Sequence, residues 1–328
     1  MFTRNVLAID AVAVTERIEQ VIRSQVLGIL RRRGVVVGLS GGIDSSVVAA
    51  LSVRALGADR VLGLLMPEQD TSQESVTLAR TLARTLGIET VTEDIGPALE
   101  SLGCFRRQVD AIRTALPVYG PGWRCKLSLP PLGEDARLNV SLLTAEAPDG
   151  TRHTARLSAS AYLQLVAATN FKQRVRATMA YYHADRRHFA VAGTPNRLEY
   201  DQGFFVKHGD GAADLKPIAH LYKTQVYALA GHLGIPEEIR RRAPTTETFS
   251  LPQTQEEFFF ALPYDQLDLC LYALNHHVPS DEVADALGFS PARVERVFRD
   301  IEGKRRATRY LHTPPLLIDS DDDDPEDP

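Results

Sequence analysis

Cysteine, tryptophan and long apolar runs are all scarce in this 328-residue sequence, which contains three cysteines and one tryptophan. Cys104, Cys125 and Cys270 lack the short spacings of a zinc site and are too few for a disulfide framework. No apolar run approaches the roughly 18 residues of a membrane helix, so we expect no membrane partner. The N-terminus has early acidic residues and no small-residue cleavage site, which predicts no signal peptide. These absences favour a cytoplasmic protein.

Excess charge of one sign occurs only at the C-terminal end. The formal net charge is −5, but residues 319–328 contain seven acidic side chains, and without them the charge would be +2. This composition predicts a disordered, solvated acidic tail over 319–328, with a site for a basic partner as the alternative.

Strand-like and helical patterns alternate along most of the chain. Helical spacing of apolar residues predicts five helices, over 11–33, 45–56, 72–88, 162–184 and 221–234. Short apolar runs predict four strands, over 35–37, 60–67, 89–95 and 188–193. Such alternation is typical of an open parallel sheet with crossover helices on both faces, so we predict an α/β fold.

The alternation is interrupted between about residues 105 and 160. Two strands are predicted there, around a turn at Pro148-Asp149-Gly150. Because the stretch contains few large apolar residues to bury, we predict a loop and hairpin insertion, not a separate domain. One α/β domain is therefore expected over 1–318, with a helical C-terminal segment over about 255–310.

The stretch VVVGLSGGIDSSVVAA, residues 35–50, places a glycine-rich turn between a predicted strand and a predicted helix. Such a turn points backbone N–H groups into one concavity, and the positive end of the helix dipole adds to the attraction for phosphate. Hydroxyls of Ser40, Ser45 and Ser46 can donate to phosphate oxygens. Asp44 would repel a bare phosphate but suits one that is paired with a divalent cation. The stretch therefore predicts a site for magnesium and a polyphosphate, with a plain glycine turn as the alternative.

This stretch resembles the SGGxDS pyrophosphate loop of the N-type ATP pyrophosphatases, and later blocks narrow the resemblance. NFKQRVR at 170–176, GTPNRLE and KHGDG within 193–211, and RRRAPTT at 240–246 are similar to ammonia-dependent NAD synthetases in order and spacing. The resemblance covers about residues 16–100 and 162–250, with a weaker match near 300–306. It implies an adenine-nucleotide α-hydrolase-like fold.

The resemblance also implies roles for individual residues. ATP would contact Gly38, Leu39, Ser40, Gly41, Gly42, Ile43, Asp44, Ser45, Ser46, Thr194, Lys223 and Thr245. Mg²⁺ would bind Asp44 and Glu199, because carboxylates suit a hard cation, and Asp44 and Lys223 would be catalytic. The dinucleotide substrate would contact Arg174, Lys207, Asp214 and Lys304. Taken singly, Glu199 and Lys223 would instead be interpreted as surface charges.

The implied reaction is an amide ligation. ATP would adenylate the carboxylate of nicotinic acid adenine dinucleotide with release of pyrophosphate, and ammonia would then displace AMP to give NAD. Cationic groups and magnesium would absorb charge on the leaving pyrophosphate, so no protein nucleophile is required. No cysteine has a glutaminase-like setting, so ammonia would come free or from a separate glutaminase. The family further implies a homodimer, with the 162–184 helix at its interface.

Four departures from the family leave other hypotheses open. LMPE at 65–68 and PTTETF at 244–249 differ from the family's segments, Gly303 replaces a histidine before Lys304, and the 105–160 insertion has no counterpart in the short bacterial enzymes. These changes fall mainly on the dinucleotide site. One alternative is therefore amidation of a different carboxylate through an acyl-adenylate, and another is a nucleotide-binding homologue without catalysis.

The C-terminal segment suggests a hypothesis of a different class. Residues 280–312 predict two helices around a turn, similar to a DNA-reading helix-turn-helix, with Arg293, Arg296 and Arg299 along one face. The alternative is a helical pair that packs on the α/β core. We favour packing and expect no nucleic-acid partner, because the chain as a whole is not basic.

Overall fold

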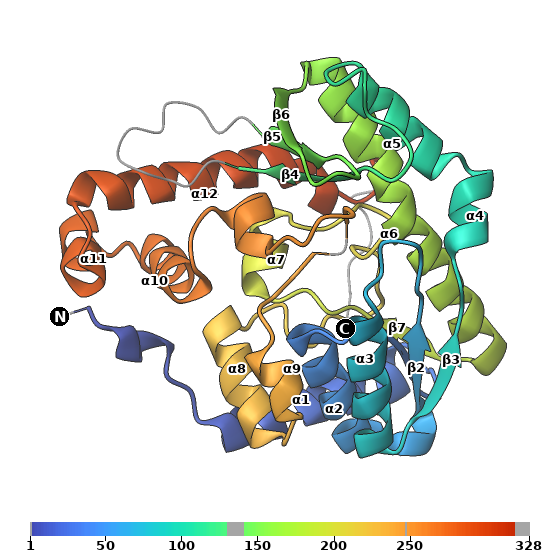
Figure 1. Cartoon of the computed structure of the whole chain (residues 1–328). Helices are drawn as coiled ribbons and strands as arrows, with labels where there is room; N and C mark the ends of the chain where they lie inside the picture. The colour runs from blue at the N-terminus through green and yellow to red at the C-terminus, as the bar shows by residue number, and fades with distance from the viewer. Residues whose placement is uncertain (1, 130–140, 247, 319–328) are drawn as a thin grey trace.

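A four-stranded parallel sheet with helices packed around it forms one side of the computed structural model, which describes residues 2–129, 141–246 and 248–318 (Figure 1). Its strands are β1 (Val35–Gly38), β2 (Val61–Leu65), β3 (Glu89–Thr92) and β7 (Ala190–Ala192). They lie in the order β3-β2-β1-β7. The chain adds β2 and β3 on one side of β1 and β7 on the other, so the order of the strands reverses at β1. The predicted open parallel sheet is confirmed.

Helices cover both faces of the sheet, because β1 buries side chains in both directions. Val35 and Val37 contact one cluster of buried residues, whereas Val36 contacts another. The first cluster joins the strands to α1 (Ala11–Arg23), its π-helical continuation η2 (Ser24–Ile29), α2 (Ile43–Leu56), α3 (Gln73–Leu86) and α8 (Lys223–His232). The second joins them to α6 (Ala159–Arg187), through Ala180 and Ala184.

The predicted element boundaries were correct to within a few residues, with one larger error. The helix predicted over 11–33 loses its regular α-helical form after Arg23, and its π-helical turn ends at Ile29. Short elements that we did not assign connect the main ones: η1 (Arg4–Leu7), η3 (Ala58–Arg60), α4 (Gly96–Ser101), α5 (Cys104–Arg113), α7 (Arg197–Gln202), α9 (Glu237–Arg241) and the π-helical η4 (Glu256–Phe260).

The inserted segment contains three strands instead of the two predicted. β5 (Leu142–Glu146) and β6 (Arg152–Arg156) flank the expected turn, and β4 (Arg124–Ser128) pairs antiparallel with β5. The expectation that this segment has little to bury was wrong. Ile112, Cys125, Leu127 and Leu143 form a buried cluster that includes Leu165 of α6. Because that core is shared with α6, the insertion is held firmly against the main sheet domain.

The C-terminal segment is helical, as predicted. Its main helices are α10 (Tyr264–Asn275), α11 (Ser280–Leu287) and α12 (Pro291–His312), and the last two are the helical pair predicted over 280–312. The side of α12 that carries Val294, Val297 and Ile301 is buried in a cluster that also takes in Phe2 and Leu7 near the N-terminus. In the part of the chain that is described, we find no helix both long and apolar enough to cross a membrane. The tail predicted over 319–328 lies outside the described residues.

Asp268 of α10 ties the C-terminal helices to the start of α8. Its carboxylate accepts hydrogen bonds from the backbone N–H groups of Lys223 at 3.2 Å and Thr224 at 2.7 Å, so it caps α8 from another element. Burial raises the pKa of Asp268 to about 6, although these hydrogen bonds oppose the shift.

This shift predicts a pH dependence of stability. The folded protein binds the Asp268 proton more tightly than the unfolded chain, whose pKa is near 3.8, so ionisation lowers stability as the pH rises from about 4 to about 6. Asp268→Asn cannot ionise, but it loses one acceptor at every pH. We therefore expect the melting temperature of the variant, relative to wild type, to rise between about pH 4 and pH 6 and then level off. A constant difference across that range in thermal denaturation would contradict the assignment.

Candidate active site

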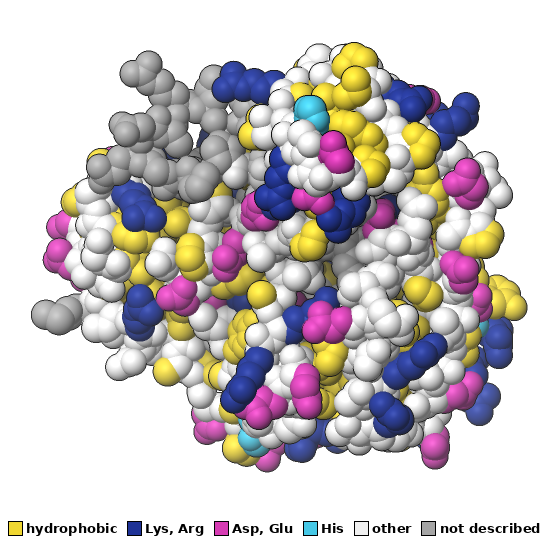
Figure 2. Space-filling model, in the orientation of Figure 1, with side chains coloured by type: hydrophobic (Ala, Val, Ile, Leu, Met, Phe, Trp, Pro, Cys, Tyr) yellow, Lys and Arg dark blue, Asp and Glu magenta, His cyan; other side chains and the backbone are white. Residues whose placement is uncertain are grey.

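A cavity of about 520 Å³ opens at the carboxyl ends of β1, β2 and β7. This is where the strand order reverses, which is the usual ligand position in open α/β sheets. Its volume falls within the range of about 300–1,000 Å³ that is typical of small-molecule sites. Figure 2 shows this face of the molecule hollowed near its centre, with basic and acidic side chains around the hollow.

The turn between β1 and α2 has a shape that requires glycine. Gly41 has a φ of +73°, and a side chain there would overlap the carbonyl oxygen of Ser75. Ser40 Oγ accepts a hydrogen bond from the Gly42 N–H at 3.2 Å, and Ser45 Oγ donates to the Gly42 carbonyl at 3.0 Å. These bonds fix the turn so that the N-terminal end of α2 meets the cavity, as an anion site needs.

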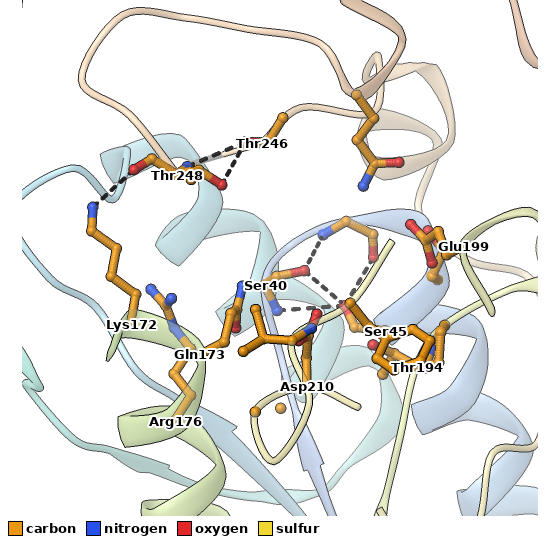
Figure 3. A pocket seen from close by; sticks show the side chains of 18 of the residues that line it. Ser40, Ser45, Lys172, Gln173, Arg176, Thr194, Glu199, Asp210, Thr246 and Thr248 are labelled. Atoms are coloured by element: carbon orange, nitrogen blue, oxygen red, sulfur yellow. Dashed lines mark hydrogen bonds between the residues drawn. The ribbon is translucent and has the colours of Figure 1, made fainter. Parts of the chain in front are cut away.

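The structure brings most of the predicted ATP-contact residues together. Those that line the cavity are Gly38, Leu39, Ser40, Gly42, Ile43, Asp44, Ser45, Thr194, Lys223 and Thr245. Gly41 and Ser46 are not among the lining residues. Ser46 is fully buried, and its hydroxyl donates to the Gly42 carbonyl at 2.8 Å, so it shapes the first turn of α2. Figure 3 shows Ser45, Thr194 and Glu199 on the side opposite α6.

Two carboxylates and one ammonium group form one charged group in the cavity lining, which we call the carboxylate centre (Asp44, Glu199 and Lys223). Lys223 is 0% exposed, and its Nζ forms an ion pair with Asp44. Asn196 joins the two acids: its side-chain amide donates to Asp44 at 3.1 Å, and its backbone N–H donates to Glu199 at 3.1 Å. Sequence reasoning missed Asn196. The pattern Asn-x-x-Glu before α7 is a capping-box signature and could have revealed it.

Burial and mutual repulsion set the ionisation of the carboxylate centre. Burial, and then the charge of Asp44, raises the pKa of Glu199 to about 8. Burial alone would lower the pKa of Lys223, but Asp44 and Glu199 raise it above its usual value. With both acids ionised, the centre carries one negative charge in excess, which a cation can compensate.

Asp44 and Glu199 are suitable ligands for Mg²⁺. This ion usually binds one or two carboxylates and completes its shell with substrate phosphates and water. Within the described ranges, no group of three or more His, Cys, Asp or Glu side chains could hold a metal on its own. The donor set therefore fits a magnesium ion that arrives with a polyphosphate better than a permanently bound metal.

A second buried charge group, the Lys172 cluster (Lys172, Glu68 and Asp70), was not predicted. Lys172 extends from the cavity side of α6, and its side chain is 2% exposed. Its Nζ contacts Glu68 at 3.0 Å, Asp70 at 2.5 Å and the Thr248 carbonyl at 3.1 Å. The cluster thus joins the loop after β2, helix α6 and the segment around Thr248. No sequence signal could have found it, because the partners are far apart along the chain.

Helical geometry separates two arginines of α6. Arg176 lines the cavity beside Lys172 and Gln173 (Figure 3), and it donates to the Met66 carbonyl at 3.4 Å. The predicted Arg174 is exposed and donates to the Lys207 carbonyl at 3.3 Å. Two residues correspond to about 200° of rotation in a helix, so these side chains point in nearly opposite directions.

The four predicted dinucleotide contacts all lie outside the cavity lining. Lys207 donates to the carbonyls of Tyr310 and Thr313 at the end of α12, and Lys304 forms an ion pair with Asp300 at 2.7 Å. Asp214 accepts from the Val191 N–H at 2.7 Å and from the Tyr181 hydroxyl at 3.4 Å. Arg174, Lys207 and Asp214 therefore belong to the outer side of α6 and the loop that adjoins it, and Lys304 is separate.

Comparison with known proteins supports a single family. The family model for NAD synthase matches residues 14–114 and 140–309. The NH(3)-dependent NAD(+) synthetase of Mesorhizobium japonicum is 62% identical over 311 residues, which is 95% of this chain and 98% of that protein. The enzyme of the same name from Rhizobium meliloti is 58% identical over 97% of this chain and 95% of its own length.

One solved structure supports the fold independently. The NH3-dependent NAD synthetase from Campylobacter jejuni in complex with the nitrate ion superposes with a TM-score of 0.62 at 23% identity, over 95% of this chain and 100% of that chain.

The family model matches part of the segment that we predicted as an insertion over 105–160. It includes residues 105–114 and 140–160, so only 115–139 fall outside it.

The Lys172 cluster predicts a large effect on stability. Lys172→Met leaves two buried carboxylates without a cation, which is expected to lower the free energy of unfolding by about 3–5 kcal/mol. Arg187→Ala, which breaks the more exposed Arg187–Glu89 pair, should lower it by less than about 1 kcal/mol. Urea denaturation measures both.

Lys172→Arg provides a second variant if the methionine variant does not fold. It keeps the positive charge and should recover most of the lost stability. A Lys172→Met protein as stable as wild type would contradict the assignment of this cluster as a structural element of the cavity wall.

Proposed function

The chain belongs to the NAD synthase family, and from this premise we propose that it is an ammonia-dependent NAD synthetase. ATP would adenylate the carboxylate of nicotinic acid adenine dinucleotide and release pyrophosphate, and ammonia would displace AMP to give NAD. The observation that carries the proposal is the carboxylate centre, which lies beside the N-terminal end of α2 in a cavity of suitable volume. We further propose a cytoplasmic enzyme that takes ammonia free from solution or from a separate glutaminase.

The turn between β1 and α2 and the carboxylate centre would contact different parts of ATP and its magnesium ion. Backbone N–H groups at the start of α2, with the hydroxyls of Ser40 and Ser45, would bind the phosphates. The ammonium group of Lys223 is buried, so solvent would weaken its attraction for the departing pyrophosphate only a little. Asp44 and Glu199 would hold Mg²⁺, which when bound would neutralise charge on the departing pyrophosphate. Thr194 and Thr245 line the cavity and are our proposed further contacts to ATP.

The dinucleotide would contact the outer side of α6 and extend into the cavity, because its carboxylate must reach the ATP that binds there. Arg174, Lys207 and Asp214 supply charged groups there, and Lys304 lies near the rim, since its Nζ is 4.8 Å from the Phe259 ring and Phe259 lines the cavity. Exposed apolar side chains, among them Leu163, occur on the same helix. We propose a homodimer in which α6 lies at the interface and borders the dinucleotide site.

Two other functions remain as alternatives. The changed segments at 65–68 and 244–249, with Gly303, would suit amidation of a different carboxylate. A nucleotide-binding protein without catalysis is the second alternative. It is less well supported, because burying Lys223 against two acids is costly for a protein that makes no use of the arrangement.

A pyrophosphate-release assay tests the function. With ATP, magnesium, ammonium and nicotinic acid adenine dinucleotide, we expect NAD and pyrophosphate to form in equal amounts. Asp44→Asn should slow turnover by at least about 100-fold, because it removes one of the two carboxylates that would hold Mg²⁺. The change also weakens the buried ion pair with Lys223, so circular dichroism well below the melting temperature checks that the variant is folded. Asp59→Asn, at an exposed acid after α2, is the matched control and should not alter turnover.

Other outcomes of this assay separate the alternatives. Pyrophosphate release driven by another acid, with none from the dinucleotide, would establish amidation of a different carboxylate. Binding of ATP without turnover of any acid would establish that the protein binds nucleotides but is not a catalyst.

Light scattering tests the dimer. We expect a mass of twice 36.2 kDa at micromolar concentration. Leu163→Glu places a charge on the outer side of α6, where the side chain is 64% exposed, and should shift the protein toward monomer. Ile29→Glu, at a 75% exposed residue at the end of η2, is the control and should leave the mass unchanged. A monomeric wild type would contradict the proposal.

A further inference from the structure

Strand β4 lies entirely within residues 115–139, the part of the chain that the family model does not match. One edge of β4 pairs with β5. Its other edge contacts residues 248–258, which we call the wall segment. The Leu251 N–H donates to the Cys125 carbonyl at 3.0 Å, and the Leu129 N–H donates to the Glu257 carbonyl at 3.0 Å. A strand that the family model does not match is therefore bonded to this segment through the backbone.

Side chains strengthen the same junction. Lys126 of β4 forms an ion pair with Glu257 at 2.6 Å. The amide of Gln253, which is 3% exposed, donates to the Leu127 carbonyl. Ser250 Oγ accepts from the Cys125 N–H at 2.9 Å. A contact that combines backbone bonds, a buried amide and an ion pair fixes both the position and the register of the wall segment.

The wall segment belongs to the cavity. Thr248, Phe249, Gln255 and Phe258 line it, as does Leu127 of β4 itself. The segment also pairs with the three residues 244–246: Thr246 N–H donates to the Gln253 carbonyl at 3.0 Å, and Gln255 N–H donates to the Pro244 carbonyl at 3.1 Å. Thr245, a proposed ATP contact, bridges to Thr254 in this small ladder. The position of Thr245 thus depends on β4 through a short series of hydrogen bonds.

We propose that β4 is a positioning strand, which holds the wall segment and Thr245 in place before any nucleotide binds. The apparent affinity for a ligand falls in proportion to the fraction of protein in the binding-competent form. A strand that holds the wall segment in its binding-competent position avoids this loss of apparent affinity. The free energy of ATP binding is then not used to order the wall segment. The positioning residues are Lys126 and Gln253. The inference rests on the proposed function only in taking ATP as the ligand.

Hydrogen exchange tests whether the wall is formed in advance. In the nucleotide-free protein, we expect the amides of Leu251, Thr246 and Gln255 to be protected from exchange, and saturating ATP to add little protection. Fast exchange at these amides that becomes slow only with ATP would overturn the proposal. This measurement needs no turnover, so its outcome is independent of whether the proposed reaction is correct.

A charge reversal tests the role of Lys126 in ATP binding. Lys126→Glu places two carboxylates together and should raise the KM for ATP by about tenfold, while kcat changes less than about twofold. Lys126→Glu combined with Glu257→Lys restores opposite charges and should return KM to near its wild-type value. Arg124→Glu is the matched control. It makes the same kind of charge reversal on the same strand, against Glu146 of β5 and away from the wall segment, and should leave KM unchanged.

Gln253→Ala provides an independent variant at a buried residue. It leaves the Leu127 carbonyl without that donor and should raise the KM for ATP and the exchange rate of Leu251 together. If the Lys126 and Gln253 variants lower the melting temperature but leave both the KM and the dissociation constant for ATP unchanged, β4 has only a structural role and the proposal falls.

Discussion

The buried ion pair between Lys223 and Asp44 is the interaction on which the rest of the structure depends. An ammonium group at 0% exposure is tolerated only where carboxylates surround it, so Asp44 and Glu199 must stay close to it. That requirement fixes the start of α2 against the start of α8. Asn196 adds α7 through both acids, and Asp268 adds α10 by capping α8. Four helices therefore meet at one point, and the turn between β1 and α2 takes its orientation from them.

Two buried lysines give the cavity two ends with different properties. Lys172 contacts two carboxylates, whereas Lys223 contacts Asp44 and is influenced electrostatically by Glu199, so each group carries one negative charge in excess when its acids are ionised. The acids of the carboxylate centre line the cavity, whereas those of the Lys172 cluster do not. Only the first group can share its excess charge with a ligand. Of the second group only Lys172 reaches the cavity lining, and its contacts connect three separate segments.

Local patterns allowed much of this fold to be predicted, and long-range contacts account for what was missed. Strand β1 and the motif at Ser40–Ser45 were predictable because period, glycine and hydroxyl signals occur within a few residues. β4 was missed although Cys125 and Leu127 alternate with polar residues, because the strand is only five residues long and lies in a stretch rich in proline and glycine. Lys172 was missed because its partners come from distant loops. The exposure of Arg174 depends on which way α6 faces, and that rotation is set by tertiary packing.

Helix α6 is the longest of the described helices, and its 29 residues span about 43 Å. One side carries Lys172 and Arg176 toward the cavity, and the other side carries Arg174 away from it. A stiff helix has no internal hinge, so a small rotation imposed on one side moves side chains on the other side in the opposite sense. A ligand on the outer side and a nucleotide in the cavity would thus each alter the affinity for the other, and by the same factor. In thermodynamic terms, the helix would link the two binding steps, and the size of that link does not depend on which ligand binds first.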